Sequence, residues 1–162
     1  MTGMGGGAGE GREPGPAAAE PPVLLGLDYG RKRIGIAVST PLRTVHPRPR
    51  LERTTLEDDL ATLAALVEET GAGAIVIGLP HHMDGKISDM EREVREFAEA
   101  VAATCDLPVF GADERLTTEA AESALRQTAK GWRERKLRRD SAAACIVLQD
   151  YLDAPARAEK IA

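Results

Sequence analysis

A short, uninterrupted apolar run that ends in a carboxylate limits the folds open to this chain. Val23–Leu27 carries no charge, which is typical of a strand buried on both faces of a sheet. Asp28 follows directly, and a buried carboxylate without a partner would be costly. We therefore expect Asp28 to meet a cation, a metal ion or hydrogen-bond donors. Because a basic triplet starts three residues later, at Arg31-Lys32-Arg33, this strand end is a candidate for chemistry on a polyanion.

Further strand and helix patterns follow in an order that defines the fold class. Strands are expected over 23–28, 34–39, 45–51, 74–79 and 107–112, and Pro47 and Pro49 favour an edge position for the third. Helices are expected over 55–71, from Ser88 to about 101, over 117–127 and over 137–152. Three consecutive strands followed by alternating strands and helices predict an α/β fold, with a mixed five-stranded sheet flanked by helices.

The composition of the two ends predicts the domain limits. Residues 1–22 are rich in Gly, Ala, Pro and Glu and hold almost no large apolar group, so we expect a disordered N-terminal tail. Residues 23–154 form one predicted domain, and residues 155–162 are expected to be a flexible C-terminal tail. The chain has 162 residues, a size that suits a single domain.

Several kinds of protein and site are disfavoured by what the sequence lacks. No apolar run is long enough to cross a bilayer, and the N-terminus has no hydrophobic signal region, so we expect no membrane association. Cys105 and Cys145 are isolated, which disfavours a structural zinc site and suits a reducing compartment. We therefore expect a cytoplasmic protein.

The distribution of charge matters more than its sum. The formal net charge is −5, which by itself argues against a nucleic-acid partner. However, the Lys and Arg residues concentrate over 31–33, 43–53 and 126–139, and binding of a polyanion follows the local field. Any one of these clusters alone is more simply a solvated surface, so the three together carry the expectation of a positive face.

Two more acids stand where the apolar pattern predicts none. Glu114 follows the strand expected over 107–112, at the carboxyl end where sites form in open α/β sheets. Asp140 lies on the apolar stripe of the last helix, although a first-turn Asp taken alone is more often a helix-end charge. Clustered carboxylates repel one another unless a cation separates them, and oxygen ligands suit Mg²⁺ or Mn²⁺. Together, Asp28, Glu114 and Asp140 predict a catalytic metal site of a metal-dependent nuclease.

Four segments carry recognisable motifs in a fixed order: GLDYGRKRIGIAVS at 26–39, IVIGLPHHMDG at 75–85, DERLTT at 113–118 and RRDSAAACIVLQDYL at 138–152. They resemble the YqgF/RuvX family, which implies an RNase H-like fold for this chain. The resemblance also implies that the catalytic acids are Asp28, Glu114 and Asp140. It implies processing of the 5′ end of pre-16S rRNA, with resolution of Holliday junctions in branched DNA as the alternative substrate.

Basic residues beside the three acids are the expected nucleic-acid contacts. They are Arg31, Lys32, Arg33, Arg115, Lys130, Arg133, Arg135 and Lys136. Trp132, which lies among them, would either stack on a base or pack in the helix. His82 stands where the family's loop often carries Asn; His81 and His82 would either contact phosphate and assist proton transfer or simply face solvent.

Two other functions are compatible with parts of the pattern. The first motif also resembles the phosphate-binding hairpin of actin-like and sugar-kinase-like ATPases, but those enzymes enclose nucleotide between two such domains and this chain has one. A non-catalytic nucleic-acid-binding or ribosome-assembly module with vestigial acids is the other alternative. A monomer and a homodimer are both open, since nothing in the sequence decides between them.

Overall fold

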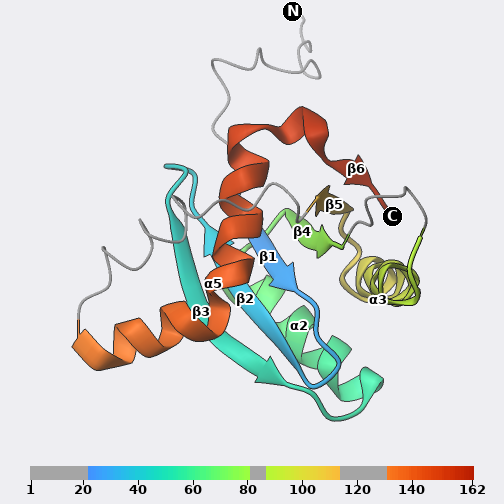
Figure 1. Ribbon diagram of the computed structural model, residues 1–162, viewed down its shortest axis with the longest axis horizontal. Coiled ribbons are helices and arrows are strands. Elements are labelled where there is room, and N and C mark those ends of the chain that lie inside the picture. The colour runs from blue at the N-terminus through green and yellow to red at the C-terminus, as the bar shows by residue number, and fades with distance from the viewer. Residues whose placement is uncertain (1–21, 81–86, 114–130) are drawn as a thin grey trace, which may run out of the picture.

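The computed structural model of the protein describes residues 22–80, 87–113 and 131–162, except for the side chain of Trp132. It is built around a six-stranded mixed sheet with the strand order β3-β2-β1-β4-β5-β6 (Figure 1). The strands are β1 Leu24–Asp28, β2 Arg33–Ser39, β3 Val45–Glu52, β4 Ala74–Leu79, β5 Val109–Asp113 and β6 Glu159–Lys160. The helices are α2 Leu56–Thr70, α3 Asp89–Cys105 and α5 Gly131–Asp153.

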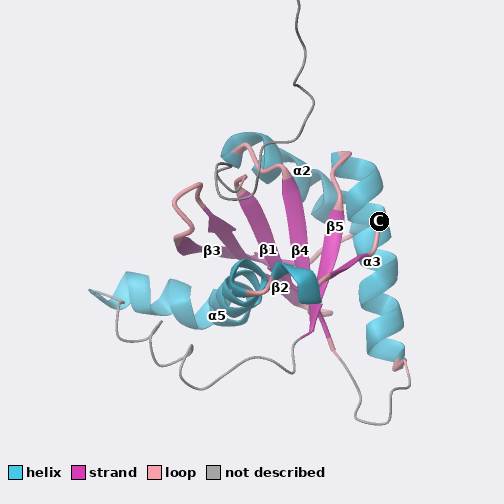
Figure 2. Cartoon of the chain, turned by 90° about the horizontal axis from the view of Figure 1, so that it is seen from above, coloured by secondary structure: helices cyan, strands magenta, loops and turns pink. Residues whose placement is uncertain are grey.

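The sheet separates two apolar layers. β1 pairs parallel with β4 and antiparallel with β2, so it lies at the centre of the sheet. Leu25 and Leu27 of β1 join the cluster formed with α2 and α3, whereas Leu24 joins the cluster formed with α5. Figure 2 shows α5 on one side of the sheet and α2 and α3 on the other. The uninterrupted apolar run of β1 is thus explained by burial of both of its faces.

Local signals placed two helices correctly. The Thr55 side chain accepts a hydrogen bond from the Asp58 N–H at the start of α2, and Gly71 ends that helix in the left-handed conformation at φ 73°. The Ser88 side chain accepts from the Glu91 N–H at the start of α3. The edge position predicted for the third strand is also confirmed, since β3 is the outermost strand on its side.

The expected five-stranded sheet needs a correction, because a sixth strand is present. Within 155–162, predicted to be a flexible tail, a short 3-10 turn over Pro155–Arg157 leads into β6, which pairs antiparallel with β5. The Val109 N–H donates to the Ala162 carbonyl at 2.9 Å, and Arg95 of α3 forms an ion pair with Glu159 at 2.7 Å. A two-residue strand leaves no periodic pattern in a sequence, and it forms here because β5 offers unpaired backbone groups.

The last helix begins earlier than predicted. α5 starts at Gly131 rather than near 137, and it contains a non-helical residue, Ser141, at φ −125° and ψ 20°. Its first residues, 131–136, are mostly charged and mask the start, because the predicted apolar stripe begins only at Leu137. The helix predicted over 117–127 lies outside the described residues. No helix in the described parts of the chain is both long and apolar enough to span a membrane.

Candidate functional site

Asp28 stands at the carboxyl end of the central strand. Side chains alternate along β1, so Asp28 belongs to the same face as Leu24 and Gly26, the face covered by α5. α5 approaches this face closely: a Cβ on Gly26 would lie 2.4 Å from Cγ of Leu148. Asp28 is half-buried, and its register partner on β2 is Gly35. The strand therefore presents a partly enclosed carboxylate toward the last helix.

Asp140 reaches the same place from α5. A Cβ built on Gly35 would lie 3.5 Å from Cβ of Asp28 and 3.5 Å from the carbonyl oxygen of Asp140. These are ordinary contact distances, so the absent Gly35 side chain is flanked by both acidic residues. Two of the three acids predicted from the sequence are thus brought together, 112 positions apart in the chain. The third, Glu114, lies outside the described residues.

Two cations hold the Asp140 carboxylate. Lys136 Nζ donates to Oδ2 at 2.8 Å, and Arg50 Nη1 lies 3.5 Å from Oδ1. The hydrogen bond from Lys136 is the main cause that lowers the pKa of Asp140, helped by the charges of Arg50 and Arg139 and opposed by burial. Asp140 is therefore ionised at neutral pH. Its alternative role as a plain helix-end charge does not account for a side chain that is 19% exposed and faces β3 through Arg50.

The residues around Gly35 suit a divalent metal ion in their chemistry. Asp28 and Asp140 both lie beside this residue, and hard ions such as Mg²⁺ prefer oxygen ligands such as carboxylates. Among the described residues, no three His, Cys, Asp or Glu side chains are grouped to hold a metal. A complete site would thus need a further ligand from the chain segments outside the description, such as 81–86 or 114–130, or from water or substrate.

The predicted basic triplet spans the turn between β1 and β2 and the first residue of β2, Arg33, and its members differ in their contacts. Arg31 pairs with Glu93 of α3, with Nη2 2.9 Å from Oε1 and Nε donating at 3.0 Å. This carboxylate raises the pKa of the Arg31 guanidinium and also accepts from the Tyr29 hydroxyl at 2.5 Å. Lys32 and Arg33 are exposed. The turn therefore offers exposed charge beside Asp28, with Arg31 already engaged in a protein contact.

One buried ion pair beneath this turn was missed in the sequence. Arg53 Nε donates to Asp59 Oδ2 at 2.9 Å, and Asp59 is only 1% exposed. The guanidinium lies 5.0 Å from the Tyr29 ring centroid and 5.1 Å from that of Phe97. It also donates to the Gly30 carbonyl at 3.3 Å, so it ties α2 and α3 to the turn. A signal existed: Asp59 falls on the inward stripe of α2, between Leu56 and Leu63.

The first ten residues of α5, 131–140, form a basic arm. They precede the bend, and Figure 1 shows this segment running away from the half of α5 that covers the sheet. Arg133, Arg135 and Lys136, three of the predicted nucleic-acid contacts, are exposed on it. The remaining two contacts predicted in this part of the sequence, Arg115 and Lys130, lie outside the described residues, as do His81 and His82. The side chain of Trp132 is likewise outside the description.

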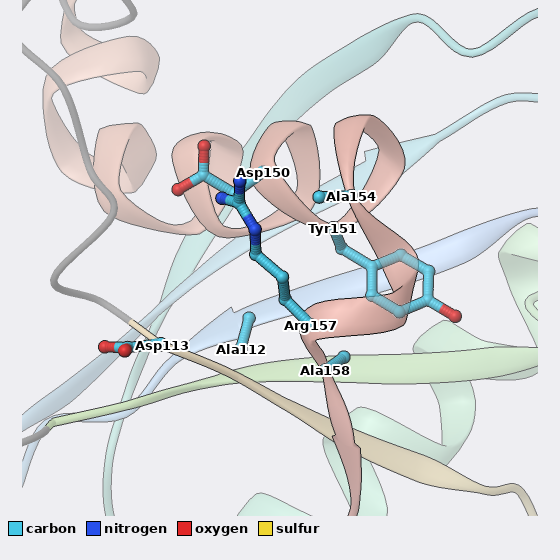
Figure 3. Close-up of a pocket in the computed structure, with 7 residues that line it drawn as sticks. All are labelled: Ala112, Asp113, Asp150, Tyr151, Ala154, Arg157 and Ala158. Atoms are coloured by element: carbon cyan, nitrogen blue, oxygen red, sulfur yellow. The ribbon is translucent and has the colours of Figure 1, made fainter.

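Two pockets elsewhere do not compete with this site. One, shown in Figure 3, holds only about 10 Å³ and is lined by Asp113, Asp150 and Arg157 among others, with the Asp113 carboxylate extending away from the other two. That volume admits at most one water. Burial, and secondarily Asp153, raises the pKa of Asp150. The other pocket, about 380 Å³ between β3 and α2, has Glu69 as its only acid among the described residues.

Comparison with known proteins identifies the family of this chain. The RuvX family, described as a Holliday junction resolvase, matches residues 22–154. A protein of Anaeromyxobacter sp. named "Putative pre-16S rRNA nuclease" is 45% identical over 130 residues, covering 80% of this chain and 95% of the relative. A protein of the same name from Thermosynechococcus vestitus is 36% identical over 144 residues, covering 85% and 91%.

Solved structures show the fold at low sequence identity. RuvC of Thermus thermophilus superposes with a TM-score of 0.56 at 10% identity, covering 85% of this chain and 99% of RuvC. The same protein in complex with a Holliday junction substrate gives 0.56 at 11% identity, covering 86% and 99%. The RNase H-like α/β fold expected from the motifs is thereby confirmed. With the family profile spanning all but the two ends, and relatives 36–45% identical over most of their length, this chain belongs to the RuvX (YqgF) family.

Proposed function

We propose that this protein is a metal-dependent nuclease that hydrolyses phosphodiester bonds, with pre-16S rRNA as its substrate. The observation that carries the proposal is that Asp28 and Asp140, far apart in the sequence, both lie next to Gly35. The nuclease names of relatives and the RuvC-like fold support it. A cytoplasmic location would follow from this function.

Asp28 and Asp140 are the proposed ligands of Mg²⁺ or Mn²⁺, with Glu114 as the third. Glu114 directly follows β5 in the sequence, and its place in the DERLTT motif is what supports it as the third ligand. A bound divalent ion would activate water and stabilise the charge that develops on phosphate oxygens. The carboxylates themselves would fix the position of the ion at the end of β1.

Exposed cations flank the acids and are the proposed phosphate contacts. Lys32 lies on the turn after Asp28 and Arg33 begins β2, whereas Arg133, Arg135 and Lys136 lie on the basic arm before Asp140. Arg31, Arg115 and Lys130 complete the proposed set. A nucleic acid that crosses the site would meet both groups, which explains how a chain with a net charge of −5 can bind a polyanion.

Branched DNA is the second candidate substrate, since the family is described as a Holliday junction resolvase and the fold matches RuvC. The deciding experiment offers pre-16S RNA and a four-way DNA junction side by side, with Mg²⁺, Mn²⁺ or EDTA. We expect metal-dependent cleavage of the RNA. Cleavage of the junction alone would mean that branched DNA, and not pre-16S rRNA, is the substrate. Binding without any cleavage would favour a non-catalytic nucleic-acid-binding module. Sedimentation of the protein with each substrate would distinguish a monomer from a homodimer.

Variants of the acids test the site itself. Asp28→Asn and Asp140→Asn should each reduce cleavage by about 10³-fold or more, on the scale of losing an essential metal ligand. Asp153→Asn is the matched control, because Asp153 is exposed at the far end of the same helix and the charge change is identical. Glu114→Gln tests the third ligand. Full activity in any of these three site variants would remove that residue from the proposed site.

A further inference from the structure

Ser141 is the residue around which α5 bends. Its φ of −125° and ψ of 20° interrupt the helix, so that the basic arm lies before it and the half that packs on the sheet lies after it (Figure 1). Sharp helix kinks arise at Pro, at Gly or Ser, or where a side chain enters a hydrogen-bond ladder. α5 contains no Pro, and its one Gly is its first residue. The cause of the bend is therefore to be sought at Ser141.

The hydroxyl of Ser141 joins two strands. It accepts from the Ile36 N–H of β2 at 3.2 Å and donates to the Arg48 carbonyl of β3 at 2.7 Å. Ser141 is 1% exposed, so these bonds are made away from solvent. Both strand groups come from elements more than 90 positions earlier in the chain. One side chain thus connects α5, β2 and β3.

The pairing of β2 with β3 is irregular where the Ser141 hydroxyl contacts the two strands. The register runs from Ile34↔Leu51 to Ile36↔Arg48, so one β2 residue faces two residues of β3 in a β-bulge. One of those two is Pro49, which has no N–H to donate. The single β2 residue is Gly35, next to Asp28. The bulge, the bend and the candidate site therefore coincide.

We propose that Ser141 is a positioning residue: its hydroxyl, inserted at the β2–β3 bulge, sets the bend of α5 and thereby places Asp140 beside Asp28. The expected effect on metal binding rests on the proposed function, but the role of Ser141 in setting the bend does not. Asp140 immediately precedes Ser141, and its carbonyl oxygen lies 3.5 Å from the position of a Gly35 Cβ. Supporting groups of this kind typically change metal affinity 10–100-fold when they are removed. The same bend fixes the direction of the basic arm.

The test compares Ser141→Ala, Ser141→Thr and a matched control, Ser39→Ala. Ser39 is also buried, at 0% exposure, and its hydroxyl accepts from the Leu24 N–H at 3.2 Å at the other end of the β1–β2 pair. Both alanine variants remove one buried hydroxyl with one or two backbone partners. Only Ser141→Ala removes it beside the acids. The threonine variant keeps the hydroxyl.

Three readouts need no substrate. Hydrogen exchange at the Ile36 amide reports the inserted bond, emission of Trp132, the only tryptophan, reports the arm, and Mn²⁺ titration reports the acids. For Ser141→Ala we expect Ile36 exchange at least about tenfold faster, an altered Trp132 emission, and Mn²⁺ binding about tenfold weaker. Ser141→Thr should restore all three toward the wild type, and Ser39→Ala should leave all three unchanged.

The outcomes are separable. Unchanged Ile36 exchange and Trp132 emission in Ser141→Ala would overturn the positioning role, and so would equal changes in Ser39→Ala. A wild-type protein that binds no Mn²⁺ would overturn the proposed metal function instead. In that case the exchange and emission results would still decide whether Ser141 sets the bend.

Discussion

The two described acids of the site are held in opposite ways. Asp28 ends a central strand, and the turn after it is braced by side chains from two helices: Arg53 with Asp59, and Glu93 with Tyr29. Asp140 instead precedes a helix bend that a single hydroxyl holds, and its carboxylate contacts Lys136, whose side chain is 53% exposed. The comparison shows that the two acids differ in how firmly their surroundings are held. The turn after Asp28 is fixed by side chains from two helices, whereas the Asp140 carboxylate can move when its cations move. Under the proposed function, a metal ion bound by Asp140 would displace Lys136, and the exposed Lys136 side chain leaves room for that exchange.

Breaking the buried ion pair between Arg53 and Asp59, which supports the turn after Asp28, should have the largest effect on stability. Arg53→Met leaves the Asp59 carboxylate buried without its cation, so we expect the free energy of unfolding to fall by about 3–5 kcal/mol. Urea denaturation would measure it. Arg92→Met is the control: it breaks an exposed pair with Asp89 and should cost less than about 1 kcal/mol. An equal, small loss in both variants would show that the brace is no stronger than a surface contact.

The close contact between α5 and the sheet at Gly26 should have the second largest effect on stability. In Gly26→Ala the new Cβ would lie 2.4 Å from Leu148 Cγ and 3.1 Å from the Ala144 carbonyl oxygen, so the helix must move. We expect a loss of about 1–3 kcal/mol by thermal or urea unfolding. Gly35→Ala is the comparison, since its Cβ meets only ordinary 3.5 Å contacts. It should lose less stability and weaken Mn²⁺ binding more, because the new methyl group would contact Cβ of Asp28 and the carbonyl oxygen of Asp140; the reverse order would contradict this view of Gly35.

Removing the hydroxyl of Tyr29, the residue after Asp28, should reduce stability less than the changes at Arg53 and Gly26. Tyr29→Phe removes the hydrogen bond to Glu93 but keeps the ring near Arg53, so we expect a loss of about 1 kcal/mol in chemical denaturation. Burial is the main cause that raises the pKa of the Tyr29 hydroxyl, with Glu93 adding to it. The phenol therefore stays protonated, and the contribution of this bond to stability should be constant between pH 6 and 8, roughly the range below its ordinary pKa. A fall in that contribution within this range would argue against a protonated donor.

The cation on the Asp140 side should have the smallest effect on stability and an opposite effect on metal binding. Lys136→Met removes an i, i+4 ion pair, at a cost of about 0.3–0.5 kcal/mol, and should tighten Mn²⁺ binding because the competing cation is gone. Lys136 lowers the pKa of Asp140, so the stability it adds is present above the ordinary value of 3.8 and is lost as the pH falls through the lowered value. NMR titration of Asp140 should show a higher pKa in the variant. Weaker Mn²⁺ binding would mean that Lys136 supports the metal instead of competing with it.

Much of the fold was predictable because its causes are local. The apolar run before Asp28 reflects burial of β1 on both faces, and Thr55 and Ser88 cap their helices through residues three positions away. β6 was not predictable, because its two polar residues form a strand only where β5 offers an edge. The sequence also pointed to Asp28 and Asp140 as acids that could meet, since one ends an apolar run and the other lies on an apolar stripe, but it did not identify Gly35 as the residue beside both.

By itself, the sequence determined most of the strands and helices, which acids were candidates and which family the chain resembles, since each of these depends on residue type and short-range spacing. The tertiary structure alone decided the distant partners: Asp59 for Arg53, Arg50 for Asp140, and the β2–β3 bulge for the Ser141 hydroxyl. The physical reason is that a polar side chain in a core is satisfied by whichever group the packing brings within hydrogen-bond distance. For Ser141 that group lies 105 positions away along the chain, beyond the reach of any periodic pattern.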